Sequence, residues 1–258
     1  MRRKTLSIVS GLVLAAGLGA LLVPALHERW VVQRLVDRNV EARGGEDAWR
    51  NVEALRYTGT AEIGLGLEVP FVLDQQHPDR MCFEYEFDGG QVEQCSDGER
   101  GWKRVPFLGT AEVQPMTESE LMDFADAADP WGLLFDFRAR GHRIDLLPDQ
   151  GVGDEVAHVL EVTLPGGSVR EVWLDAETGL ELKVVSTRML AKKERRVETE
   201  YGDWTTTHGL TIPRRQVTRT EGDDQAHTLT VETLQVNPRM KVTRFLPPAS
   251  LRAGSGEG

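Results

Sequence analysis

The side chains with the most distinctive chemistry are Cys82 and Cys95, the only two cysteines in the 258-residue chain. They end the stretch CFEYEFDGGQVEQC, in which Asp88-Gly89 is a strong signal for a two-residue hairpin turn. Counting outward from that turn sets Cys82 opposite Cys95, at a position where facing side chains lie closest. A metal site would need further Cys or His, and a redox pair typically reads Cys-x-x-Cys. The pattern therefore favours a structural disulfide, with two free thiols as the alternative.

The same hairpin register predicts which side of the sheet each residue faces. One face is expected to carry the apolar side chains Phe83, Tyr85, Phe87 and Val92. The cysteines share the other face with glutamates and glutamine, so the disulfide is expected on the side exposed to water. Closing a loop of this size contributes about 3 kcal/mol in the loop-entropy model. A disulfide also indicates an oxidising compartment.

The remaining reactive side chains predict no catalytic group. The six histidines are dispersed, with no H-x-x-x-H or H-E-x-x-H spacing that would hold a metal. No serine lies in a G-x-S-x-G turn, which would present a nucleophile. We therefore expect a protein that is not an enzyme, with no metal and no cofactor.

Charge and the N-terminal segment narrow the setting. The formal net charge of −11 argues against nucleic acid as a partner. Arg2-Arg3-Lys4 precede an apolar run over residues 6–26, and Ala25 follows small residues, which predicts an export signal cleaved after that residue. The run is also long enough for a permanent membrane anchor. Either alternative places the rest of the chain in the periplasm, soluble or anchored in the inner membrane.

The elements that position these residues follow from periodicity. Apolar residues at helical spacing over 28–43 predict an amphipathic helix that stops at Gly44-Gly45. The period then changes to two, and a strand over 61–73 is expected to carry an apolar stripe on one face: Ile63, Leu65, Leu67, Val69, Phe71 and Leu73.

A second helical stretch begins at Thr117 and breaks before Pro130. From residue 156 onward, strands and short turns alternate, which predicts an antiparallel meander. The fold class is therefore mainly β: a curved antiparallel sheet covered by an N-terminal helix and a mid-chain helical lid.

Five stretches in this order resemble the outer membrane lipoprotein-sorting proteins, relatives of the periplasmic lipoprotein carrier LolA. They are ARGGEDAWRNVEALRYTGT, DGERGWKRVPFLG, WLDAETGLELKV, YGDWTTTHGLTIP and VNPRMKVTRFLPP. The resemblance covers most of residues 38–248. It implies a half-open β barrel whose apolar cavity takes the acyl chains of lipoproteins or a related lipid. The cysteine pair and the long apolar N-terminus depart from the family pattern.

The expected organisation is a signal peptide or anchor at 1–25, a single LolA-like lipid-binding domain at 26–248 and a disordered tail at 249–258. The expected ligand-binding residues come from the stripe, the hairpin, the segment after it and the helical lid: Leu65, Leu67, Val69, Phe71, Phe83, Tyr85, Trp102, Phe107, Leu121, Phe124, Trp131 and Leu134. The alternative for the stripe is ordinary core packing, and Trp102 and Phe107 could equally be structural.

Two functions are consistent with this sequence. The first is a periplasmic carrier or chaperone that holds acyl chains of lipoproteins or phospholipid, in lipoprotein sorting or envelope lipid transport. The second is a membrane-anchored sensing or interaction module with the same half barrel, which engages an inner- or outer-membrane partner protein.

Overall fold

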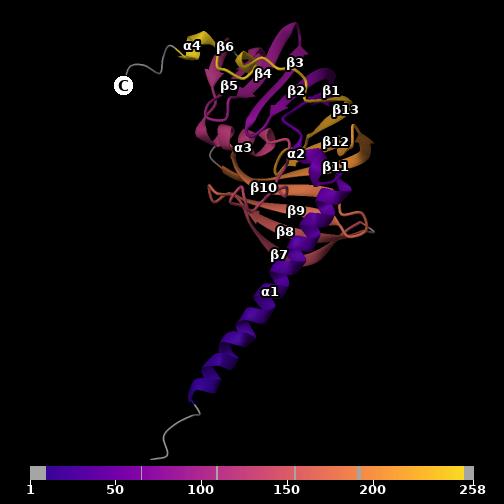
Figure 1. The fold of residues 1–258 in the computed structure, drawn as a ribbon. Helices are drawn as coiled ribbons and strands as arrows, with labels where there is room; N and C mark the ends of the chain where they lie inside the picture. Colours follow the sequence, from indigo (N-terminus) through magenta and orange to yellow (C-terminus); the bar gives the residue numbers. More distant parts are fainter. Residues whose placement is uncertain (1–9, 65, 109, 154, 191–192, 253–258) are drawn as a thin grey trace, which may run out of the picture.

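The protein is built on one open antiparallel sheet (Figure 1). The structure, a computed structural model, describes residues 10–64, 66–108, 110–153, 155–190 and 193–252. The strands are β1 (Ala54–Glu62), β2 (Glu68–Gln76), β3 (Arg80–Phe87), β4 (Gly90–Ser96), β5 (Gly101–Val105), β6 (Thr110–Pro115), β7 (Arg143–Val152), β8 (Glu155–Thr163), β9 (Val169–Asp175), β10 (Glu181–Leu190), β11 (Lys193–Thr207), β12 (Leu210–Thr220) and β13 (Ala226–Val236). The predicted fold class, a mainly β curved antiparallel sheet with helices, is confirmed.

The strand order is β6-β5-β4-β3-β2-β1-β13-β12-β11-β10-β9-β8-β7. The first and last strands of the chain therefore pair at the centre of the sheet, through Leu55↔Val236 and its neighbours. The two edges, β6 and β7, come from the middle of the chain. One connection joins them, and it contains the helix α3 (Glu118–Ala128).

The N-terminal helix packs against one half of this sheet. It is α1 (Ser10–Ala42), which contains the predicted helix over 28–43 and projects beyond the sheet (Figure 1). Val32 and Val36 are buried against β7, β8 and β9. The buried Asn39 amide donates to the carbonyl of Gly179 (3.0 Å), which fixes the helix to the turn before β10.

A second apolar cluster lies where the chain passes from α1 to β1. The short helix α2 (Glu46–Arg50) buries Trp49, whose indole N–H donates to the carbonyl of Arg43 (2.9 Å). The cluster joins residues of β1, β2, β12 and β13 to the segment after α3: Trp49, Val52, Leu55, Ala61, Val69, Phe71, Phe135, Leu210, Ile212, Val231 and Leu234.

The predicted strand over 61–73 is wrong in its first half. β1 ends at Glu62, and the chain turns through residues 63–67, where the Ile63 N–H donates to the carbonyl of Leu67 (3.0 Å). Gly64 and Gly66 adopt positive φ values of 115° and 72°, which glycine accepts readily. The glycines therefore form a hairpin turn, and the stripe continues on β2 only from Val69.

The predicted helix after residue 116 is confirmed as α3, with a reciprocal capping box between Thr117 and Glu120. The predicted tail at 249–258 begins with α4 (Ala249–Arg252), and residues 253–258 lie outside the described part of the chain.

The predicted export or anchor segment is only partly described. Residues 1–9 lie outside the described residues, and residues 10–25 are described as helical backbone alone. Among the described residues, no helix has the length and apolar character needed to cross a membrane.

Candidate functional site

On β1 to β5, we call the face of the sheet that α3 covers the inner face and the opposite one the outer face. The inner face carries a continuous aromatic surface. Strand register sets Phe71 opposite Tyr85 and Leu73 opposite Phe83. The Phe71 and Phe83 rings lie 5.6 Å apart, and the Phe83 and Tyr85 rings 5.7 Å apart. Phe71 is buried, whereas Phe83 and Tyr85 are half-buried. We call Phe71, Leu73, Phe83, Tyr85 and Phe87 the inner aromatic surface.

Burial also shows in the tyrosines of this face. It raises the pKa of Tyr57 to about 12, because the phenolate form would lose its hydration, although nearby Arg43 opposes the shift. Burial likewise raises the pKa of Tyr85. Both shifts have the same cause, which is that the two hydroxyl groups lie in a poorly hydrated part of this face.

The members of the predicted apolar stripe have different positions. Leu65 lies outside the described residues. Leu67 is 43% exposed in the turn before β2, which Gly64 and Gly66 form with positive φ values. Val69 and Phe71 are buried in the apolar cluster around Trp49.

The predicted lid is divided between three places. Leu121 and Phe124 lie half-buried on α3, which packs against β3, β4 and β10. Trp131 stacks on His77, with ring centroids 3.9 Å apart, and its indole N–H donates to the carbonyl of Val52 (3.0 Å). Leu134 is buried in the other cluster, against α1. The two residues on α3 lie over strands of the inner aromatic surface, and Trp131 packs against the same apolar cluster as Phe83 and Tyr85.

Among the described residues, few polar contacts hold α3 on the sheet. Lys103 of β5 forms an ion pair with Glu120, and the Gln75 side chain of β2 donates to the carbonyl of Ala127 (2.5 Å). The Lys103 and Glu120 side chains are partly exposed, and exposed pairs of this kind are worth about 0–1 kcal/mol. Displacing α3 from the sheet would therefore break weak polar contacts.

The disulfide between Cys82 and Cys95 is present, and its expected exposure to water is wrong. Both cysteines are 0% exposed on the outer face. They are covered by residues 238–252, which we call the C-terminal strap. Phe245 of the strap is fully buried and packs with the cysteines and Trp102.

Two other predicted site residues lie away from the inner aromatic surface or at its margin. Trp102 of β5 pairs with Cys95 of β4 and belongs to the cluster that the two cysteines form with Phe245 on the outer face. Phe107 lies in the short helix η1 (Pro106–Leu108), is 51% exposed, and meets the Phe87 ring edge-on at 5.3 Å. Alternation along the sequence cannot distinguish Trp102 from a residue of the inner aromatic surface, because the strap that covers Trp102 comes from a distant part of the chain.

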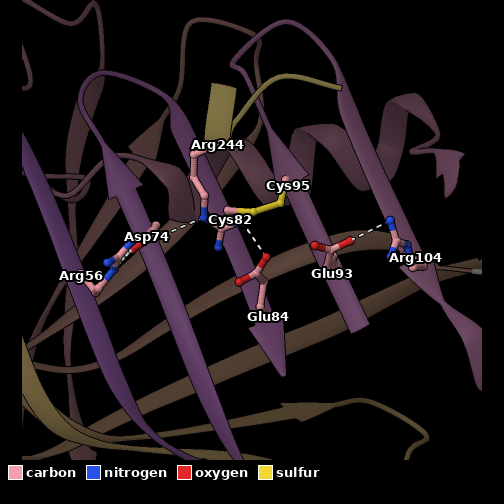
Figure 2. Close-up of a disulfide and its surroundings, with 8 residues drawn as sticks. All are labelled: Arg56, Asp74, Cys82, Glu84, Glu93, Cys95, Arg104 and Arg244. Carbon is pink, nitrogen blue, oxygen red and sulfur yellow. Dashed lines mark hydrogen bonds and ion pairs between the residues drawn. A yellow bond between two sulfur atoms is a disulfide. The ribbon is translucent and has the colours of Figure 1, made fainter. Parts of the chain in front are cut away.

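The outer face also carries a row of charged side chains on adjacent strands (Figure 2). We call it the charge ladder, and its members on β1 to β5 are Arg56, Asp74, Glu84, Glu93 and Arg104. Asp74 is fully buried and accepts from Arg56 Nε (2.6 Å) and Nη2 (2.9 Å).

The C-terminal strap adds one further cation to this ladder. Arg244 donates through Nε to Asp74 Oδ2 (3.0 Å) and through Nη1 to Glu84 Oε1 (2.6 Å). At the other end, Arg104 Nη2 lies 3.3 Å from Glu93 Oε2. Burial, followed by a side-chain hydrogen bond with Glu84, raises the pKa of Glu93. The strap is therefore fixed to the sheet by ion pairs as well as by Phe245.

Two cavities accompany these elements. The outer pocket, of about 340 Å³, has a floor of Glu93, Trp102 and Arg104 and a roof of strap residues Thr243, Arg244 and Leu246-Pro247-Pro248. The second, of about 310 Å³, lies between α1, α2 and the segment 135–138. Neither is lined by the inner aromatic surface. Among the described residues, no group of three or more His, Cys, Asp or Glu could hold a metal ion.

Solved structures share this fold. A DUF1329 family protein from Desulfovibrio piger matches with a TM-score of 0.58 and 14% identity, over 83% of this chain and 97% of that chain. A LolA superfamily protein from Nitrosomonas europaea matches with a TM-score of 0.56 and 13% identity, over 84% and 97%. An outer membrane lipoprotein-sorting protein domain from Vibrio parahaemolyticus matches with a TM-score of 0.55 and 14% identity, over 83% and 97%.

These matches confirm the LolA-like fold expected from the sequence. The fold is an open antiparallel sheet with helices, and it extends over most of the chain. No protein-family model matches the sequence, and comparison with curated proteins gives no match.

Proposed function

We propose that this protein is a periplasmic binding protein that holds an acyl chain of a lipoprotein or lipid against the inner aromatic surface. The observation that carries the proposal is the half-buried run of Phe83 and Tyr85, on the face that α3 covers. The fold shared with a lipoprotein-sorting domain supports it. No catalytic group is needed, because binding and release of the ligand are the whole activity.

Entry of the ligand requires α3 to move away from the sheet. Each methylene transferred from water to an apolar surface gains about 0.8 kcal/mol, so ten methylenes supply about 8 kcal/mol before ordering costs. The polar contacts of α3 described above are worth far less than this. The acyl chain must also replace the apolar contacts of Leu121 and Phe124 with the sheet, so the proposal is that it displaces α3 and offsets this loss by its own burial over Phe83 and Tyr85.

The test compares two substitutions that introduce the same charge. In Tyr85→Glu the carboxylate lies on the inner aromatic surface, where an unpaired buried charge is costly. In Leu67→Glu it lies in the exposed turn. We expect Tyr85→Glu to weaken binding of a fluorescent acyl probe by at least about tenfold, and Leu67→Glu to leave it unchanged. Circular dichroism checks that both variants are folded.

Equal probe binding by wild type and a folded Tyr85→Glu variant would contradict the proposal. So would recovery of no lipid, by extraction and native mass spectrometry, from protein purified from the cell envelope, together with no probe binding by the delipidated protein.

The alternative is a membrane-anchored module that engages another envelope protein. This alternative predicts that α1, which runs from Ser10 to Ala42 through the predicted cleavage point at Ala25, stays whole in the mature protein (Figure 1). N-terminal sequencing of the protein from the envelope separates the two functions. A mature chain that begins at Met1 would favour the module, whereas one that begins near residue 26 would favour a diffusing carrier.

A further inference from the structure

The outer pocket contains two buried hydrogen-bond donors without a partner. Trp102 is 5% exposed, and its Nε1–H has no hydrogen-bond acceptor among the described residues. The same is true of the Nε–H of Arg104. A buried donor left unpaired costs about 1–3 kcal/mol. Two such donors on one pocket floor therefore indicate a place for an acceptor.

Other indoles in the molecule show that this is unusual. Trp49 donates to the carbonyl of Arg43 (2.9 Å), Trp131 to the carbonyl of Val52 (3.0 Å), and Trp173 to Glu171 Oε2 (3.1 Å). In each case the fold supplies the acceptor. The indole of Trp102 instead lines a pocket of about 340 Å³, near the lower end of the size range of ligand pockets.

The two donors are placed to act together. Trp102 and Arg104 are two residues apart on β5, so their side chains project from the same face of the sheet. Both line the outer pocket beneath the C-terminal strap. One ligand group with two acceptor oxygens can therefore meet both donors.

Charge decides which acceptor suits the pocket. Its lining carries the guanidinium groups of Arg104 and Arg244 and the carboxyl group of Glu93. Arg244 is committed to Asp74 and Glu84, whereas Arg104 pairs with Glu93 through Nη2 and leaves its Nε–H unused by the described residues (Figure 2). The raised pKa of Glu93 reduces the negative charge that a ligand would meet. A group with a single negative charge therefore fits better than a dianion.

We propose that the outer pocket binds a small monocarboxylate, whose oxygens accept hydrogen bonds from Trp102 Nε1 and Arg104 Nε. Its hydrocarbon part lies against the apolar roof formed by Leu246, Pro247 and Pro248. This site is on the opposite face of the sheet from the inner aromatic surface, and it does not depend on acyl-chain binding there.

The experiment titrates the full-length protein with hexanoate at pH 7 and follows the indole resonances by ¹H–¹⁵N nuclear magnetic resonance. The Trp102 resonance is assigned by its loss in Trp102→Phe. We expect a saturable shift of this resonance with hexanoate and none with hexanol, which has the same chain but no carboxylate. Loss of one charge-assisted hydrogen bond should weaken binding about tenfold in Arg104→Lys, in which the Trp102 resonance is retained.

Two controls separate this site from general effects. Trp173→Phe removes an indole that already has an acceptor, and it should leave hexanoate affinity unchanged. Tyr85→Glu alters the inner aromatic surface and should also leave it unchanged, so the two proposals can fail independently. A Trp102 resonance that hexanoate does not shift, meaning that the pocket holds water alone, would overturn the inference. An equal response to hexanol would overturn it as well.

Discussion

The two faces of β1 to β5 differ in nearly every respect, although they are built from alternate residues of the same strands. The inner face presents half-buried aromatic rings, and α3 covers it through a few weak polar contacts among the described residues. The outer face carries ion pairs and the disulfide, and the C-terminal strap is fixed over it by Arg244 and Phe245. The strong and covalent contacts are concentrated on the outer face, and the weak ones on the inner face.

This separation suits a binding protein. A ligand that displaces α3 breaks no contact of the charge ladder or of the disulfide, as far as the described residues show. The strands beneath the ligand can therefore keep their register while the cover moves. Three variants test whether the contacts of the outer face stabilise the sheet as strongly as their number and burial indicate.

The largest effect is expected from Asp74→Ala. Asp74 is fully buried and pairs with both Arg56 and Arg244, so its removal leaves Arg56 without its carboxylate and Arg244 with Glu84 alone. We expect a loss of about 3–5 kcal/mol in the free energy of unfolding, measured by urea denaturation. The control is Glu200→Ala, which breaks an exposed pair with Arg219 and should cost less than about 1 kcal/mol. Equal losses in the two variants would show that the ladder contributes little.

Removal of the disulfide is expected to have the next largest effect. The double variant Cys82→Ala/Cys95→Ala opens a loop whose ends are 13 residues apart in sequence, which is worth about 3 kcal/mol in the loop-entropy model. Thermal and urea unfolding under non-reducing conditions measure the loss. At temperatures where the variant remains folded, acyl-probe binding should match the wild type. A variant that is folded but has lost binding would show that the two faces are coupled.

The smallest effect is expected from Glu93→Gln, and it depends on pH. The folded-state pKa of Glu93 is raised by burial and by Glu84, so the folded protein resists ionisation more than the unfolded chain does. The wild type therefore loses stability relative to the Glu93→Gln variant as pH rises through the ordinary carboxyl range toward the raised pKa. Unfolding free energies of both proteins from pH 3.5 to 7 test this. A relative loss in the variant at pH 7 would mean that the Arg104 ion pair outweighs burial.

Sequence patterns predicted the hairpin register and the fold well. The Asp88-Gly89 turn fixes the pairing of Cys82 with Cys95 locally, without help from the rest of the chain. The order of the turn and strand motifs indicated the LolA-like fold. The failures have non-local causes. Charged residues alternating with aromatic ones normally face water, and only the packing of Arg244 and Phe245, far along the chain, buries this face.

The candidate site was harder to predict than the fold. The apolar alternation runs through Gly64 and Gly66, so it predicted a continuous strand with Leu67 on the same face as Phe71. In the structure, the positive φ values of these two glycines turn the chain instead. Trp102 has the alternation and aromatic character of a lining residue. Its position on the outer face follows from the register of β5 against β4, in which the turn containing Asp97-Gly98 sets Cys95 opposite Trp102.

The pairing of β1 with β13 has a consequence for the order in which the chain assembles. β1 to β6 and β7 to β13 each form a meander of strands that are neighbours in sequence, and such local hairpins form quickly. Leu55 can meet Val236 only when nearly the whole domain has been synthesised and the ends of both meanders have found each other. Because its partners are so far apart in sequence, we expect the pairing of β1 with β13 to be the slow step of folding, and until it forms the edges of these two strands are open to mispairing.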